Sequence, residues 1–301
     1  MPPVVRGAIS ATLLALNTLF WCLSLFAFAV VKWVLPFKPV RKVVDRVLNF
    51  IATCWIAGNS GWMKLVGRTE WDVQGIDDLE YGGWYLVNAN HQSWVDILVL
   101  QHLLNRRIPL LKFFLKQQLI WVPVIGPAWW ALDFPFMRRH STAYLLRHPE
   151  KRHQDLETTR RACRKFGLVP TSVMNFAEGT RFTAAKHKAQ RSPYRHLLKP
   201  KAGALALALD VLGDRFDELL DVTIVYPGGV PTFWDLLCGT VRKVIVRVQR
   251  RPIPPGLRHG SYTDDPAYRH AFQLWLKTLW DDKDARIDAL LAGREHVHHP
   301  H

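Results

Sequence analysis

The residue types best suited to proton transfer are a histidine and an aspartate, His91 and Asp96, which lie five residues apart in the segment NHQSWVD. This segment follows a strand-like run that ends near Val87, and ligand chemistry in open α/β sheets concentrates at such strand ends. Five residues of unbroken helix turn about 500°, which would leave the two side chains about 140° apart. We therefore expect His91 in the turn and Asp96 in the first turn of the following helix. There the carboxylate can accept one ring N–H and leave the other ring nitrogen free to take a proton from an alcohol.

The same segment also has a purely structural interpretation. Ser93 and Asp96 have the spacing of a capping box, in which the carboxylate satisfies backbone donors and favours the positive end of the helix dipole. Residue types and spacing leave both interpretations open.

A second polar group, formed by Glu178, Gly179, Thr180 and Arg181, closes another strand-like run. The turn offers backbone N–H groups, a hydroxyl and a guanidinium, and a guanidinium presents paired donors to phosphate oxygens. These residues are therefore candidates for binding a phosphate group. The alternative is an ordinary turn in which Glu178 and Arg181 pair with each other.

A third candidate is the arginine pair Arg138-Arg139, which ends the strand-like run 134–137. The pair could bind an anion at the end of its strand, and the alternative is that both side chains are simply solvated.

Strand-like and helical runs alternate after Trp71, which predicts an α/β domain that places these groups at strand ends. The expected strands are 84–87, 109–114, 134–137, 172–176, 221–226 and 241–248, and the expected helices are 94–104, 153–166, 202–212 and 267–291. The basic, proline-containing stretch 190–201 is expected to form a surface loop.

The amino-terminal segment contains 25 residues without a charge, from Gly7 to Val31, which is long enough to cross a membrane as a helix. Five basic residues follow within 15 positions, against only Arg6 before it, so the bulk of the chain is expected on the cytoplasmic side. The alternative is a signal peptide cleaved after the sequence Ala27-Phe28-Ala29.

A second uncharged run, from Asn49 to Met63, has 15 residues and contains two glycines. Because it is short for a full crossing, we expect an interfacial or re-entrant segment in the headgroup layer. A core helix of the soluble domain is the alternative.

Forty Lys and Arg residues against 25 Asp and Glu residues give a net charge of +15, which favours anionic lipid, nucleic acid or phosphorylated partners. The four cysteines are far apart and form no C-x-x-C pair, which argues against a disulfide framework or a zinc ribbon. One hypothesis is thus a membrane-tethered protein that binds anionic lipid or nucleic acid with its basic face.

With these motifs, the chain resembles the glycerolipid acyltransferases, in particular the 1-acyl-sn-glycerol-3-phosphate acyltransferases, over roughly residues 73–248. The family's H-x4-D motif is similar to His91 and Asp96, and its Phe-Pro-Glu-Gly-Thr-Arg motif is similar to residues 176–181. The other similar positions are Lys116, Pro123, Gly126 and Arg138 for a second block, Lys199 to Gly203 for a Lys-Gly element, and Val222 to Pro227 for a hydrophobic-Pro block. Two positions depart from the pattern: Ala177 replaces the usual proline, and Met137 stands where an acidic residue often precedes the arginine.

The resemblance implies a mixed sheet flanked by helices and a reaction without a metal or cofactor. His91 would be the general base that deprotonates the free hydroxyl of lysophosphatidic acid, and Asp96 would orient it. Glu178, Gly179, Thr180 and Arg181, with Arg138, would bind the acceptor. The donor would be acyl-coenzyme A or acyl-acyl-carrier protein, and the acceptor lysophosphatidic acid or another lysophospholipid such as lysophosphatidylglycerol.

Four segments then follow along the chain. They are a transmembrane anchor over 1–36, an interfacial helical segment over 37–68, an acyltransferase domain over 69–255, and a carboxyl-terminal helix with a His-rich tail over 256–301. We expect a single-pass protein with its catalytic domain on the cytoplasmic side of a membrane, which would be the inner membrane in a bacterium. Anionic membrane lipids are the expected further partners, and nucleic acid is not expected.

Overall fold

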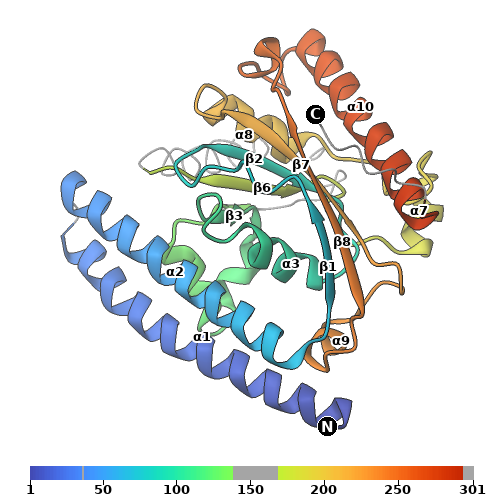
Figure 1. Ribbon diagram of the computed structural model, residues 1–301. Coiled ribbons are helices and arrows are strands. Elements are labelled where there is room, and N and C mark those ends of the chain that lie inside the picture. The colour runs from blue at the N-terminus through green and yellow to red at the C-terminus, as the bar shows by residue number, and fades with distance from the viewer. Residues whose placement is uncertain (36, 138–168, 294–301) are drawn as a thin grey trace.

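A six-stranded sheet forms the centre of the computed structural model, which describes residues 1–35, 37–137 and 169–293 (Figure 1). The strand order is β1-β8-β7-β2-β6-β3, and β7 and β8 are antiparallel while the other neighbours are parallel. The strands are β1 (Glu70–Gln74), β2 (Tyr85–Ala89), β3 (Leu111–Phe113), β6 (Ser172–Phe176), β7 (Glu218–Val225) and β8 (Lys243–Arg251). The expected α/β fold with a mixed sheet is confirmed.

Helices cover both faces of this sheet and create two apolar cores (Figure 1). The first core joins the sheet to α1 (Pro3–Val34), α2 (Lys38–Val66) and α3 (Val95–Leu104), and the second joins it to α8 (Gly203–Leu212) and α10 (Pro266–Leu291). Because the central strands are covered on both sides, all five residues of β2 are buried.

Shorter elements complete the described part of the chain. They are the two-stranded sheet of β4 (Leu115–Lys116) and β5 (Phe136–Met137), the helices α4 (Ile125–Ala131), α7 (Ala184–Gln190) and α9 (Phe233–Leu237), and the 3-10 turns η1 (Gln117–Trp121) and η3 (Pro255–Leu257). The expected helix 153–166 lies outside the described residues.

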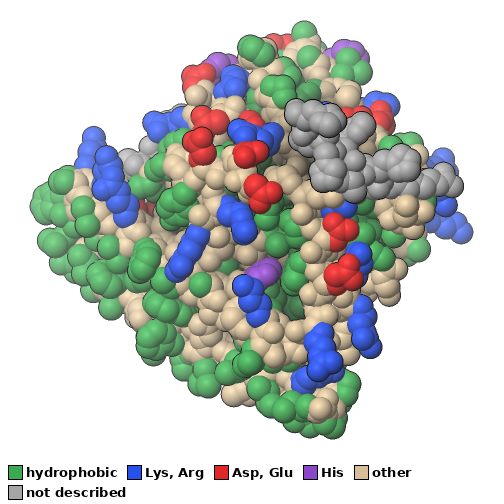
Figure 2. Space-filling model, in the orientation of Figure 1, with side chains coloured by type: hydrophobic (Ala, Val, Ile, Leu, Met, Phe, Trp, Pro, Cys, Tyr) green, Lys and Arg blue, Asp and Glu red, His purple; other side chains and the backbone are tan. Residues whose placement is uncertain are grey.

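The amino-terminal helices α1 and α2 lie side by side, and α1 contains the whole uncharged run predicted to cross a membrane (Figure 1). Within the described residues, α1 is the one helix whose length and apolar composition suit a membrane span. Figure 2 shows hydrophobic side chains gathered over this helix pair. Its exposed large apolar residues include Leu16, Phe20, Leu23, Phe50 and Leu65.

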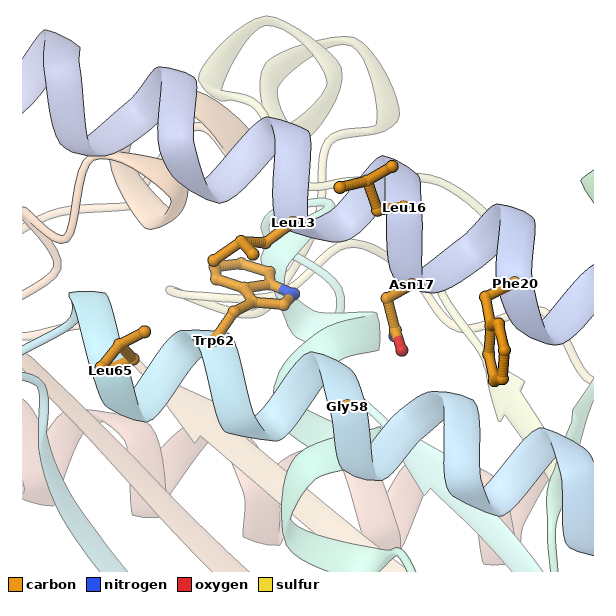
Figure 3. Close-up of a pocket in the computed structure, with 7 residues that line it drawn as sticks. All are labelled: Leu13, Leu16, Asn17, Phe20, Gly58, Trp62 and Leu65. Carbon is orange, nitrogen blue, oxygen red and sulfur yellow. The ribbon is translucent and has the colours of Figure 1, made fainter.

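The second uncharged run forms no re-entrant turn, because α2 is one continuous helix of 29 residues. Its two glycines do not break the helix, and Gly58 has a packing role instead. A Cβ on Gly58 would lie 2.2 Å from the amide oxygen of Asn17 on α1, so glycine permits the close approach of the two helices. Asn17 in turn donates to the Trp55 carbonyl and to Asn59. Figure 3 shows Asn17 facing Gly58 across the groove between the helices.

A cluster of charged side chains joins the helix pair to the rest of the protein. Lys32, at the end of α1, forms ion pairs with Asp45 of α2 and with Asp133, which follows α4. Lys112 of β3 is buried close to both carboxylates, and its burial lowers the pKa of the ammonium to about 8. These four groups balance in charge, which allows them to be buried together.

Two further differences from the sequence analysis concern β1 and the stretch 190–201. Strand β1 was not expected, because Glu70–Gln74 is only half-buried and owes its conformation to the pairing with β8. The stretch 190–201 is not simply a surface loop, because Leu197 and Leu198 are fully buried in the second core. The segment that follows η3 also contributes to that core, since Phe272, Trp280 and Ile287 of α10 have no exposed surface.

Candidate active site

Two neighbouring strands bring the two main candidate motifs together. Strands β2 and β6 are parallel, and their last residues, Ala89 and Phe176, are directly paired. Because parallel strands end at the same edge of the sheet, the segments 90–96 and 177–182 both emerge there. A hydrogen bond of 2.7 Å from the Phe182 N–H to the His91 carbonyl joins the two segments directly.

His91 lies in the turn after β2, and Asp96 lies in the first turn of α3, as their spacing predicted. The Nδ1 atom of His91 lies 2.9 Å from Oδ2 of Asp96. The histidine ring stacks on Phe176, with 4.0 Å between ring centres and an interplanar angle of 14°. When Nδ1–H donates to Asp96, Nε2 carries a free lone pair and can accept a proton.

The Asp96 carboxylate also accepts hydrogen bonds from the backbone. The structural and the chemical interpretations of this motif are therefore compatible. Its Oδ2 atom accepts from the backbone N–H groups of Gln92 at 2.6 Å and Ser93 at 2.8 Å. The reciprocal half of a capping box is not formed, because the Ser93 hydroxyl accepts from the Val95 N–H instead. Three donors from the segment 91–93 therefore hold one fully buried carboxylate in place.

Tyr226, at the end of β7, donates from its hydroxyl to Asp96 Oδ1 at 2.6 Å. Burial and the adjacent Asp96 charge raise the pKa of Tyr226 well above its ordinary value, so the hydroxyl stays a donor. Sequence reasoning did not single out Tyr226 as a site residue. The only signal was its position within the hydrophobic-Pro block 222–227.

Glu178 is fully buried and directs its carboxylate at the backbone. Oε1 accepts from the His91 N–H at 2.7 Å, and Oε2 accepts from the Leu198 N–H at 2.9 Å. Burial raises the pKa of Glu178 to about 7, although both of these hydrogen bonds oppose the shift. Among the described residues Glu178 forms no ion pair with Arg181, so the turn is not simply closed by that pair.

The rest of this turn carries cationic groups on the segment whose Phe182 N–H is hydrogen-bonded to the His91 carbonyl. Gly179 has a φ of +68°, which favours glycine, and a Cβ there would lie 3.2 Å from the Lys201 side chain. Lys186 of α7 donates to the Thr180 hydroxyl at 2.8 Å. The exposed Arg181 guanidinium lies 4.9 Å from the centre of the Trp94 ring.

The block formed by Lys116, Pro123, Gly126 and Arg138 lies only partly within the described residues. Lys116 of β4 pairs with Met137 of β5, which brings the two ends of the block together. Arg138 follows immediately but lies outside the described residues, so its predicted role in binding the acceptor stays a prediction. Within the described ranges, no three metal-ligating side chains converge on one point.

Comparisons with known proteins agree with this arrangement of motifs. The family model described as Acyltransferase matches residues 70–227, which is more than half of the chain. The chain is 27% identical over 196 residues to 1-acyl-sn-glycerol-3-phosphate acyltransferase epsilon of Mus musculus, covering 57% of this chain and 51% of that protein. It is 26% identical over 271 residues to the gamma protein of Homo sapiens, covering 82% and 65%. This chain therefore spans only about half to two thirds of the length of these relatives.

Two further proteins match almost the whole chain. Lysocardiolipin acyltransferase 1 of Danio rerio is 25% identical over 296 residues, covering 94% of this chain and 70% of that protein. The crystal structure of the 1-acyl-sn-glycerophosphate acyltransferase PlsC from Thermotoga maritima is similar in fold, with a TM-score of 0.50 and 17% identity. That match covers 93% of this chain and 98% of PlsC.

Proposed function

The chain belongs to the acyltransferase family, and from that premise we propose that it transfers a fatty acyl group to the free hydroxyl of lysophosphatidic acid, giving phosphatidic acid. The observation that carries the proposal is the contact of His91 with Asp96 at the edge of the sheet where the Glu178–Arg181 turn also emerges. This edge combines a base for the hydroxyl with cationic groups for a phosphate.

The proposed reaction needs only one proton-transfer group. The acceptor hydroxyl loses its proton to Nε2 of His91 while its oxygen attacks the carbonyl carbon of an acyl thioester. Asp96 faces the imidazolium that forms, which stabilises its charge. The tetrahedral intermediate then expels the thiolate, the C–S bond breaks, and the thiolate takes the proton from His91. The products are the new ester and a free thiol, and no acyl-enzyme forms.

Charge and exposure suggest how the two substrates are bound. Arg181 and Thr180, with Arg138, would bind the phosphoglycerol group, and Gly179 would let the backbone approach it closely. Glu178 would contribute indirectly, because both of its oxygens already accept backbone N–H groups. The donor would be acyl-coenzyme A or acyl-acyl-carrier protein, and both are anions that suit the +15 charge of the chain.

The helix pair supports a location at a membrane, where both the lysolipid and the acyl chain partition. We propose that α1 anchors the protein in the membrane through its exposed apolar side, and that the catalytic domain, which contacts both ends of α1, lies on the cytoplasmic side. Trp130 lies on α4, which contacts α1, and Trp121 lies on the adjoining turn η1; they are 58% and 84% exposed and would lie at the interface.

The acceptor has one alternative that a specific observation favours. The match to lysocardiolipin acyltransferase 1 covers 94% of this chain, more than the match to the gamma protein covers. A larger anionic lysophospholipid, such as lysophosphatidylglycerol, is therefore the second candidate.

The test is acyl transfer from palmitoyl- and oleoyl-coenzyme A to a panel of lysophospholipids, repeated with acyl-carrier-protein donors. We expect transfer to lysophosphatidic acid that falls about a thousandfold in His91→Ala. The matched control is His259→Ala, which removes an exposed histidine that also contacts a carboxylate, that of Asp214. The control should keep wild-type activity.

Each other outcome has a definite meaning. Faster transfer to lysophosphatidylglycerol would support the second acceptor. The absence of transfer to every lysolipid from both donor classes, by folded wild-type protein in membranes, would overturn the proposal. It would favour a protein that binds anionic lipid or nucleic acid with its basic face.

A further inference from the structure

The carboxyl-terminal helix α10 contacts the segment that supports the candidate base. The indole Nε1–H of Trp280 donates to the Leu198 carbonyl at 3.0 Å. Neither side chain has any exposed surface, so water does not compete for this hydrogen bond. Trp280 lies outside the residues 70–227 that the family model matches.

The backbone N–H of Leu198, which belongs to its other peptide group, connects this contact to the candidate site. Its N–H donates to Glu178 Oε2 at 2.9 Å, and Glu178 Oε1 accepts from the His91 N–H at 2.7 Å. Three hydrogen bonds thus join the Trp280 indole to the backbone of His91, and together they form a hydrogen-bond relay. Both peptide groups of Leu198 are held, one by the indole and one by the carboxylate.

One turn further along α10, Lys283 attaches the helix to the sheet. Its ammonium forms an ion pair of 2.8 Å with Asp221 and also donates to the Val222 carbonyl. Val222 is the direct partner of Ala89, the last residue of β2, which leads into His91. The helix is therefore fixed at the same level of the sheet as the base.

We propose that Trp280 is a positioning residue for His91, acting through Leu198 and the Glu178 carboxylate. This inference rests on the proposed function, because it gives His91 the role of base. The loss of the indole N–H would leave the buried Leu198 carbonyl without its donor and release the 197–199 segment. Glu178 would then lose its fixed partner, and the backbone of His91 could shift relative to the substrate.

The test compares two tryptophans of the same helix. Trp280→Phe removes the N–H, and Trp275→Phe is the matched control, because Trp275 packs against Phe272 on the same core. We expect kcat to fall about tenfold in Trp280→Phe with both KM values within twofold of wild type, since small displacements at a reacting centre slow the chemical step. The control should change neither. Equal kcat values in the two variants would overturn the proposal.

A second Trp280 variant keeps the test decisive. Replacement of Trp280 by benzothienylalanine keeps the ring shape without the N–H, so it applies if Trp280→Phe does not fold. The same tenfold loss of kcat is expected, and an unchanged kcat would contradict the relay.

Hydrogen–deuterium exchange separates this inference from the proposed function, because it needs no activity. In either Trp280 variant, the Leu198 amide should exchange about tenfold faster than in wild type. If wild type transfers no acyl group but this exchange changes, the proposed function fails and the structural relay stands. If the exchange does not change, the relay fails whatever the activity.

Discussion

The pair His91–Asp96 at the edge of the sheet and the pair Lys283–Asp221 inside it share one chemistry, a carboxylate facing a nitrogen base, in different surroundings. Both carboxylates are fully buried, but the His91 side chain keeps 12% of its surface exposed, whereas that of Lys283 has none. Asp96 also accepts from two backbone N–H groups and a tyrosine, whereas Asp221 faces a second cation, Arg286, at 3.6 Å.

The difference shows what a pair of a carboxylate and a nitrogen group needs in order to transfer a proton. A base must exchange its proton with a substrate, so one partner must be reachable while the other is held rigidly. The edge pair meets both conditions. The interior pair is sealed, and burial lowers the pKa of Lys283 while the Asp221 charge opposes this shift. It is suited to holding α10 against β7. One residue of each pair also acts on Glu178: the Asp96 charge raises the pKa of Glu178, and the Lys283 charge lowers it.

The largest effect should come from breaking the interior pair. Lys283→Met leaves the buried Asp221 charge without its nearest partner, which we expect to lower the free energy of unfolding by about 3–5 kcal/mol. Urea unfolding in detergent micelles measures this. The double variant Lys283→Met, Asp221→Leu removes both charges and should recover most of the loss. A single variant as stable as wild type would show that the pair is not ionised.

The pH dependence of stability should report on Glu178, between the two pairs. Its pKa is about 7 in the folded protein against an ordinary value of 4.5, so between these pH values the folded chain holds a proton that the unfolded chain has released. The free energy of unfolding should therefore fall by about 3 kcal/mol as the pH rises through this window. Glu178→Gln has no such group, so its thermal unfolding between pH 5 and pH 8 should depend less on pH. An identical dependence in both proteins would argue against the raised pKa.

The edge pair should respond most strongly in activity. Asp96→Asn keeps the size of the side chain but removes the charge that faces the imidazolium, so kcat should fall about a hundredfold. Initial rates with lysophosphatidic acid measure this loss. Asp214→Asn, which changes the exposed partner of His259, is the control and should be silent. An Asp96→Asn variant with wild-type kcat would reduce Asp96 to its capping role.

The smallest effect should follow from Tyr226→Phe. The variant removes one of the four donors to Asp96 and leaves the Oδ1 atom unpaired. We expect a loss of about 1 kcal/mol in stability and a fall in kcat of about three- to tenfold. Thermal unfolding and initial rates measure the two effects. A loss of activity as large as that of Asp96→Asn would mean that Tyr226 itself takes part in the reaction.

Local patterns predicted the elements with strong apolar signals. The expected strand 172–176 matches β6 residue for residue, and the expected helices 202–212 and 267–291 match α8 and α10 within one residue at each end. These segments are buried on faces that their own residue types specify. Strand β1 was missed because its five residues include Glu70 and Asp72, and its conformation depends on pairing with β8.

Contacts between distant residues were beyond the reach of local patterns. Tyr226 lies 130 positions from Asp96, and Trp280 lies 82 positions from Leu198. The sequence did not indicate that Leu198 is buried, since the basic and proline-rich stretch around it is typical of a surface loop. Only the packing of α10 over this stretch makes it part of a core.

Local spacing and composition therefore specify the apolar helix, the α/β alternation and the residue types of the site. The contacts that those residues make depend on the tertiary packing. The strand order places β2 between β6 and β7, and this arrangement brings Glu178 to the backbone N–H of His91 and Tyr226 to the Asp96 carboxylate. Periodicity along a chain specifies which face of a strand is buried, but not which strand lies beside it. The partners of a buried carboxylate follow from that neighbour.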